Sequence, residues 1–258
     1  MTEDPVTVEQ RDDLALVTLS LPRKRNALTM ELRAVLLDKL DAIMSDATTR
    51  AIVLTGAGGY FCAGGDLKSM QSGEPLKARH RMMAVHRIVR LLAEGPKPVV
   101  SAVEGVAFGG GMALAALADC CVAARDARFG AVFGKVGLAP DMGLLWAVPA
   151  RIGLARTRRM AMLSEEVSGE EGARLGLVDV LTEPGQALDT ALAEARRFAA
   201  VAPVSVAATK MAFARLPGSL DTALADEINQ QSALMQTDDH AEARAAFFDK
   251  RDPVFRGK

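Results

Sequence analysis

The stretch KPVVSAVEGVAFGGGMALAALADCCVA, residues 97–123, decides the fold class. Its β-branched run at 98–105 predicts a buried strand, and the glycine-led, alanine-rich run at 106–118 predicts a helix. DCCVAARD, residues 119–126, predicts a second short strand. This order of strand, loop, helix and strand indicates a parallel sheet covered by helices.

The same alternation extends toward the N-terminus, where strands are predicted at 13–22 and 50–56. Between them, Thr29 is a suitable N-cap for an amphipathic helix that ends near Ser45. Beyond residue 143 only one short strand is predicted, at 177–181. Further helices are predicted around 82–92 and at 144–163, 169–175, 186–201, 204–215, 219–236 and 239–250. The sequence therefore predicts an α/β core followed by a helical C-terminal part.

The composition limits the class of protein. The chain has 258 residues, 50% of them hydrophobic, so it can bury a substantial core. Its formal net charge of -1 gives no indication of nucleic acid or an anionic membrane as a partner. No apolar run reaches the roughly 18 to 20 residues that span a bilayer, and the acidic start MTEDPVTVEQ lacks the features of a signal peptide. We therefore expect a cytoplasmic protein.

The cysteines and histidines do not indicate a metal site. The chain contains three of each, and no spacing between them resembles a zinc site. Cys120 and Cys121 lie in an apolar run and are expected in the core. Cys62 lies in a glycine-rich loop with no histidine nearby in the sequence, which disfavours a nucleophilic role. No metal is expected.

Two glycine-rich loops follow two successive predicted strands, FCAGGDL at 61–67 and FGGGMAL at 108–114. Neither fits a dinucleotide-binding or P-loop motif, and no G-x-S-x-G motif of the α/β hydrolases occurs. In open parallel sheets ligands bind beyond the carboxyl ends of the strands, where helix N-termini present free N–H groups. Two such groups directed at one oxygen form an oxyanion hole, which stabilises an enolate or a tetrahedral intermediate. The alternative for each loop is tight packing of helix against sheet.

GLAPDMG, residues 137–143, places one acidic residue in a turn that is otherwise apolar or glycine. Pro140, Asp141 and Gly143 are ordinary turn residues, so Asp141 has a purely structural interpretation. A carboxylate that faces an apolar pocket is, however, suited to act as a general base. The local sequence leaves both interpretations open.

The order of these motifs resembles that of the crotonase, or enoyl-CoA hydratase/isomerase, superfamily over nearly the whole chain. The segments that carry the resemblance are LPRKRNALT (21–29), FCAGGDLKSM (61–70), the stretch at 97–123, FGAVFGKVGLAPDMG (129–143), EEGARLGLVD (170–179) and AFFDKRDPVF (246–255). The resemblance implies an α/β fold with a crotonase-like ββα spiral core over residues 1–200 and a helical C-terminal trimerisation region over residues 201–258. It also implies a homotrimer or a dimer of trimers that acts on an acyl-CoA thioester. Coenzyme A is then part of the substrate, and no other cofactor is expected.

The resemblance also assigns roles to individual residues. The backbone N–H groups of Gly65 and Gly110 correspond to the oxyanion-hole donors. The residues that correspond to CoA contacts are Arg23, Lys24, Arg25, Cys62, Ala63, Asp66 and Leu67. Lys250 is expected to reach the CoA phosphates of a neighbouring subunit. For the three cations at 23–25, a solvated basic run is the alternative.

The chain departs from the two-glutamate hydratases of this superfamily. At the positions that correspond to their glutamates it has Ala113 and Phe133, which are expected to line the acyl pocket with Met142. Alanine and phenylalanine can neither position a water molecule nor protonate a carbon. Asp141 instead matches the P-D/E-x-G turn in which several isomerases of the superfamily carry a single acid/base.

The prediction is therefore an enoyl-CoA isomerase that works through an oxyanion-stabilised enolate, because an allylic shift needs only the one carboxylate of Asp141. Hydratase, hydrolase or lyase chemistry on an acyl-CoA through Asp141 is the alternative within catalysis. A catalytically silent acyl-CoA-binding paralogue is the alternative outside it, because both glutamates are missing.

Overall fold

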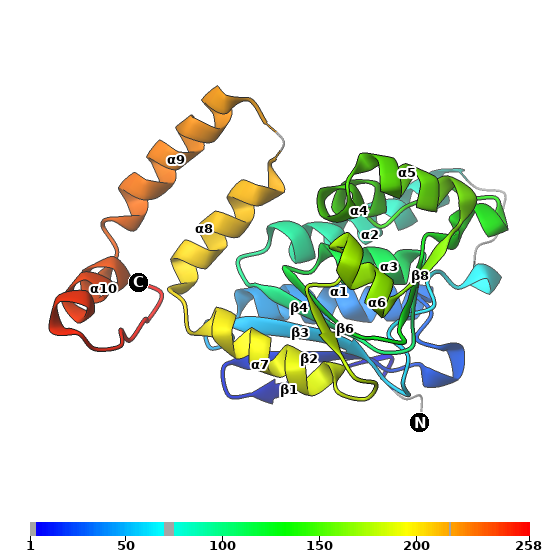
Figure 1. Ribbon diagram of the computed structural model, residues 1–258, viewed down its shortest axis with the longest axis horizontal. Helices are drawn as coiled ribbons and strands as arrows, with labels where there is room; N and C mark the ends of the chain where they lie inside the picture. Colours follow the sequence, from blue (N-terminus) through cyan, green and yellow to red (C-terminus); the bar gives the residue numbers. More distant parts are fainter. Residues whose placement is uncertain (1–3, 70–74, 217) are drawn as a thin grey trace.

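A six-stranded sheet organises the chain, and Figure 1 shows helices on both of its faces. The computed structural model describes residues 4–69, 75–216 and 218–258. The strands of this sheet, in spatial order, are β1 (Val6–Arg11), β2 (Leu14–Leu19), β3 (Ala51–Gly56), β4 (Val99–Val103), β6 (Cys120–Ala124) and β9 (Val180–Thr182). β1 pairs antiparallel with β2, and all other neighbours pair parallel. The predicted α/β fold with a parallel sheet is confirmed.

Side chains alternate between the two faces of the sheet, as the period of a strand requires. Along β2, Leu14 and Leu16 belong to the core cluster that includes α7 (Ala187–Ala199). Val17 and Leu19 belong to the larger cluster on the opposite face. The helices of that face are α1 (Met30–Ser45), α2 (Pro75–Glu94) and α3 (Gly110–Leu117). One short strand thus contributes to both hydrophobic cores.

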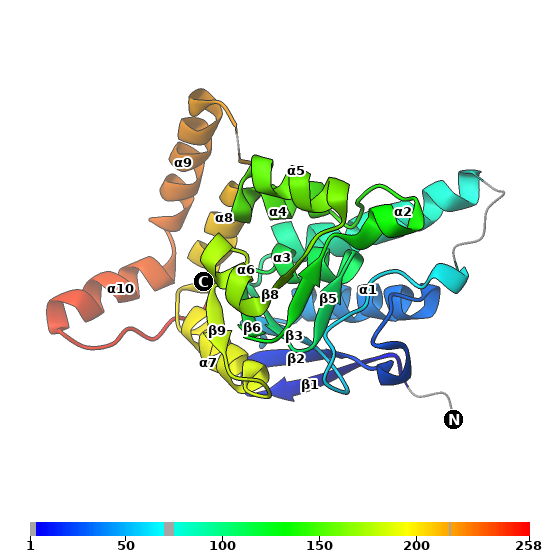
Figure 2. The same cartoon turned by 45° about the vertical axis from the view of Figure 1, so that its right-hand side comes forward.

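A smaller sheet of three strands stands beside the larger one (Figure 2). It consists of β5 (Val106–Phe108), β7 (Arg128–Gly130) and β8 (Glu166–Ser168). The helix predicted over 106–118 is therefore wrong at its start, because residues 106–108 pair with β7 and α3 begins only at Gly110. β8 was not predicted, since three residues show no periodicity from which a strand can be recognised.

Local signals set the ends of the helices. The side chain of Thr29 accepts a hydrogen bond from the N–H of Leu32 (3.1 Å), which confirms the predicted N-cap of α1. The remaining helices are α4 (Leu144–Ile152), α5 (Leu154–Leu163), α6 (Gly169–Leu175), α8 (Pro203–Ala214), α9 (Leu220–Leu234) and α10 (Asp238–Asp249). A single helix over 144–163 was the wrong prediction, because Gly153, with φ 77° and ψ 156°, separates α4 from α5.

The last helices project away from the sheet in Figures 1 and 2. The buried ammonium of Lys210 on α8 attaches this part to the core through Asp119 Oδ2 at 2.6 Å. α9 has no buried residue, and its Leu220, Leu224 and Ile228 are exposed at a spacing of four residues. An exposed apolar row on one helical face marks a surface that can bury area against another element. Within the described residues, we find no helix with the length and apolarity to cross a membrane.

Candidate active site

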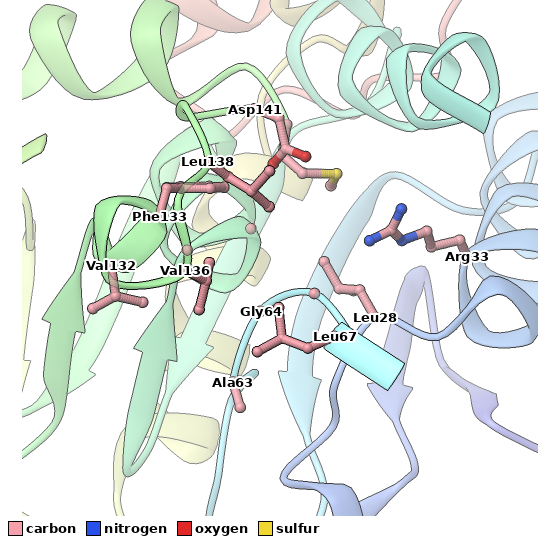
Figure 3. A pocket seen from close by; sticks show the side chains of 14 residues that line it. Leu28, Arg33, Ala63, Gly64, Leu67, Val132, Phe133, Val136, Leu138 and Asp141 are labelled. Carbon is pink, nitrogen blue, oxygen red and sulfur yellow. The ribbon is translucent and has the colours of Figure 1, made fainter. Parts of the chain in front are cut away.

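One cavity lies where the two glycine-rich loops meet, and Figure 3 shows the side chains around it. The empty space inside it and at its open mouth together is about 550 Å³. Glycine backbone and apolar side chains make up most of its wall, among them Leu28, Phe133 and Met142. Arg33 and Asp141 are the charged residues that the described part of the chain contributes to the wall.

Glycine at two positions lets the loops approach each other backbone to backbone. A Cβ on Gly111 would lie 2.2 Å from the carbonyl oxygen of Cys62, and one on Gly64 would lie 2.6 Å from that of Phe108. This close approach allows two main-chain hydrogen bonds at Cys62. Its N–H donates to Val106 O (2.9 Å), and its carbonyl oxygen accepts from Phe108 N (3.0 Å). The loop after β3 and the strand before α3 are therefore held together by main-chain bonds.

The amides of Gly65 and Gly110 both border the cavity. Gly110 is the first residue of α3, so its N–H has no acceptor within the helix and carries the partial positive charge of the helix N-terminus. Among the residues that the structure describes, neither amide has a hydrogen-bond acceptor. Two N–H groups without an acceptor thus belong to residues of different loops that line one cavity. A pair of this kind is what a single ligand oxygen can use.

Asp141 lies in the turn between the 3₁₀ helix η3 (Val132–Val136) and α4. The two residues after it, Met142 and Gly143, have positive φ angles of 55° and 77°. Left-handed backbone is uncommon for a residue other than glycine, so the turn holds Met142 in a conformation that the surrounding packing must impose. This turn aims the carboxylate of Asp141 into the cavity (Figure 3).

The surroundings of Asp141 favour its protonated form. Burial raises the pKa of Asp141 above that of an ordinary aspartate, and it outweighs the opposite effects of Arg33, a local backbone hydrogen bond and His86. A carboxyl group with a raised pKa is suited to accept a proton and to return it.

Arg33 reaches the cavity from α1 and is not among the residues predicted for the site. Figure 3 shows its guanidinium directed toward the same space as the carboxylate of Asp141. A signal was present: Arg33 precedes the buried Leu37 and Leu40 by four and seven residues, so a charged side chain stands in the apolar stripe of the helix. The side to which that stripe faces could not be known from the helix alone.

Apart from Lys250, the predicted CoA-binding residues lie on two loops. The loops are joined by the buried side chain of Asn26 and by two main-chain hydrogen bonds, from Ala63 N to Arg25 O (2.9 Å) and from Leu28 N to Gly64 O (2.8 Å). Asn26, with φ 56°, accepts a hydrogen bond from Leu21 N (2.9 Å) through Oδ1. Its Nδ2 donates to the carbonyl oxygens of Ala57 (2.9 Å) and Tyr60 (2.7 Å). The loop at 21–28 therefore lies against the loop that follows β3.

Both loops present the residues that were predicted on them. The cations of the first loop, Arg23, Lys24 and Arg25, are exposed. The guanidinium of Arg25 lies 5.5 Å from the ring centroid of Tyr60. On the second loop, Ala63 and Leu67 border the cavity, and Asp66 accepts a hydrogen bond from Lys68 N (3.2 Å).

Seven predicted site residues do not line the cavity: the three cations at 23–25, Cys62, Asp66, Ala113 and Lys250. Cys62 is fully buried, and burial raises the pKa of its thiol to about 12, so the thiol is protonated at neutral pH. Ala113 is fully buried in the larger core cluster and does not border the cavity. Lys250 is the C-cap of α10, a helix that Figure 1 shows away from the sheet. Nowhere in the described ranges do histidine, cysteine, aspartate and glutamate side chains form a group able to hold a metal ion.

Comparisons with known proteins agree on the family and differ on the reaction. Residues 9–258 match the family model for enoyl-CoA hydratase/isomerase. The 1,2-epoxyphenylacetyl-CoA isomerase of Escherichia coli (strain K12) is 36% identical over 247 residues, 94% of each chain. The short-chain-enoyl-CoA hydratase of Clostridium acetobutylicum is 31% identical over 248 residues, 95% of each chain. The crystal structure of an enoyl-CoA hydratase from Mycobacterium tuberculosis H37Rv is similar with a TM-score of 0.90 and 37% identity, covering 99% of this chain and 100% of the other.

Proposed function

The chain belongs to the enoyl-CoA hydratase/isomerase family, and within it we propose that the protein is an isomerase that moves the double bond of an enoyl-CoA from the 3 to the 2 position. Enzymes of the family transform acyl-CoA thioesters, so the family supplies the substrate class. The choice of isomerisation rests on the acid/base groups around the cavity.

The observation that carries this proposal is the position of Asp141. Among the described residues it is the one acid on the cavity wall, and its pKa is raised by burial. Phe133 borders the same cavity and Ala113 is in the core, and these residues stand where the two hydratase glutamates are expected. Hydration requires groups that position water and protonate carbon, whereas an allylic shift requires one base that returns its proton.

The reaction then proceeds in two proton transfers. The carboxylate of Asp141 removes a proton from Cα of the 3-enoyl thioester, and the electron pair of that C–H bond delocalises onto the thioester oxygen. The N–H groups of Gly65 and Gly110 donate to this oxygen, and each donor contributes roughly 100- to 1,000-fold in rate. The protonated Asp141 returns the proton to Cγ, which leaves the double bond between Cα and Cβ.

The proposed CoA site uses the two joined loops. Arg23, Lys24 and Arg25 meet the phosphates, and residues 63–67 contact the adenine and pantetheine, while the buried Cys62 supports this segment from below. Exposed cations suit phosphates that remain in contact with solvent. We also propose a homotrimer or a dimer of trimers, in which the exposed apolar row of α9 is covered and Lys250 lies beside the CoA of a neighbouring subunit.

The test compares Asp141→Asn with the wild type on matched 3-enoyl-CoA and 2-enoyl-CoA thioesters. Asparagine keeps the size and hydrogen bonding of aspartate but cannot take up the proton, so isomerisation should fall by roughly 100- to 10,000-fold with little change in thioester binding. Asp126→Asn is the matched control, because Asp126 is exposed and away from the cavity. If Asp141→Asn keeps near-normal turnover, Asp141 has only a structural role in its turn and the proposal is wrong.

Hydration is the second candidate, favoured by the name of the Clostridium acetobutylicum relative. It predicts that the wild type converts 2-enoyl-CoA to the 3-hydroxy thioester. If the wild type hydrates 2-enoyl-CoA and Asp141→Asn does not, the proposed isomerisation is wrong, but Asp141 is still the acid/base residue. If neither thioester is converted but both bind, the protein is a silent acyl-CoA-binding paralogue.

A further inference from the structure

Arg33 is a half-buried positive charge whose guanidinium has no ion-pair partner among the described residues. Its Nε is fully buried, without a hydrogen-bond acceptor among those residues. Burial lowers the pKa of Arg33 and outweighs the opposite effects of the carboxylates of Asp141 and Asp66, while the charge of Arg81 on α2 acts in the same direction as burial. A charged donor that is removed from water is normally compensated by an anion or by hydrogen bonds.

The cavity wall offers Arg33 little compensation. Apart from Asp141, the side chains that the described residues contribute to the wall are apolar, so they hold no other carboxylate. Asp141 and Arg33 attract each other at a distance but do not form an ion pair, and the pKa of Asp141 remains raised in spite of Arg33. The proposed base is therefore not neutralised by the cation across the cavity.

The arrangement leaves a cation, an acid and two free amides around one space. The amides of Gly65 and Gly110 fix the thioester oxygen, and Asp141 serves the carbons next to it. Arg33 reaches the same space from a different element, α1, and its planar fork matches a carboxylate in two parallel hydrogen bonds. The donors of Arg33 thus line the same cavity as the proposed reaction centre, where a charged group on the acyl chain of a bound thioester can meet them.

We propose that the preferred substrate carries a carboxylate on its acyl group, and that Arg33 binds this carboxylate. Arg33 is then the residue that determines acyl specificity. The inference rests on the proposed function for acyl-CoA binding, but it does not depend on which reaction Asp141 performs. It applies equally to an isomerase, a hydratase or a binding protein.

The experiment measures binding of saturated thioesters, which cannot react by a double-bond shift. Calorimetry compares succinyl-, glutaryl- and adipoyl-CoA with butanoyl-, pentanoyl- and hexanoyl-CoA, which have the same chain lengths without the carboxylate. The methyl ester of adipoyl-CoA is a further control, because it keeps the two oxygens of the terminal carboxyl group but lacks its negative charge. The proteins are the wild type, Arg33→Leu and the control Lys39→Leu. Lys39 is a cation on the same helix as Arg33, but its ammonium pairs with Asp4 at 3.2 Å.

The wild type and Lys39→Leu should bind at least one carboxylated thioester about tenfold or more tightly than its hydrocarbon counterpart. Arg33→Leu should lose this preference, and the methyl ester should bind like hexanoyl-CoA. Arg33→Met provides the same comparison if the leucine variant does not fold.

Three results would overturn the inference: equal binding of both series by the wild type, a preference that survives in Arg33→Leu, or a methyl ester that binds as tightly as the acid. If no thioester of either series binds, the proposed function itself fails, and the two failures are thereby distinguished.

Discussion

Replacing Gly110 by proline tests whether its amide acts on the substrate. Proline lacks the N–H, and the first position of a helix accommodates it because that N–H has no acceptor within the helix. The φ angle of Gly110 is not in the left-handed region, so an L-residue can occupy the position. The variant therefore removes one proposed oxyanion donor while α3 retains its internal hydrogen bonds.

The structure supplies the control and the magnitude. A Cβ at position 110 would lie 2.9 Å from Leu28 Cδ1 and 3.1 Å from Met142 Cγ, both side-chain atoms that can shift by a few tenths of an ångström. Gly110→Ala introduces this contact and keeps the N–H, so it measures the steric cost, about 1 to 3 kcal/mol of overpacking. The further loss from Gly110→Ala to Gly110→Pro should be about 100- to 1,000-fold in turnover, the value of one donor.

The assay is the initial rate of 3-enoyl-CoA isomerisation, with circular dichroism to verify that each variant is folded. Because the proline ring also occupies part of the space in front of the amide, binding of hexanoyl-CoA is measured in parallel. A folded Gly110→Pro that turns over as fast as Gly110→Ala would show that Gly110 serves only the close packing of the loops.

Two further predictions concern proton transfer and assembly. Burial raises the pKa of Asp141 and the carboxylate is the active form, so kcat/KM should decline on acidification at a pH above the ordinary aspartate value of about 3.9. Since Arg33 lowers the pKa of Asp141, Arg33→Leu should move this decline to higher pH, and an unchanged pH–rate profile would contradict the electrostatic coupling. Because α9 has no buried residue, light scattering at micromolar concentration should give the mass of a trimer or a hexamer, and a monomer would refute the assembly.

The sequence predicted those features that depend on local chemistry. Thr29 precedes an apolar periodic run, and it caps α1 as expected. The glycine-rich composition of the two loops predicts close approach of their backbones. In the structure, Gly64 and Gly111 lie so close to a carbonyl oxygen of the other loop that a Cβ would not fit. Asp141 drew attention as the one acid of an apolar turn, and its carboxyl group borders the cavity.

The features that were missed depend on contacts between distant segments. Residues 106–108 and 166–168 are too short to show a period, and only their pairing with β7 makes them strands. Arg33 was missed because the orientation of α1 over the glycine loops determines that its side chain meets the cavity. Ala113 was expected in the acyl pocket, but its side chain faces the core, a distinction that depends on the rotation of α3.

The side chain of Asn26 joins two chain segments that are some thirty residues apart in sequence, and two main-chain hydrogen bonds join the same segments. All three of its hydrogen bonds go to main-chain groups, so the register between the segments does not depend on the identity of the neighbouring side chains. The side chains at 23–25 take no part in these hydrogen bonds, so the contact with the ligand's phosphates can change through these side chains while the main-chain connection to the loop of Gly65 is kept. Only the exposed side chains of the loop at 21–28 can vary in this way. A displacement of the Asn26 amide would instead move the phosphate-binding loop and the loop that carries Gly65 together.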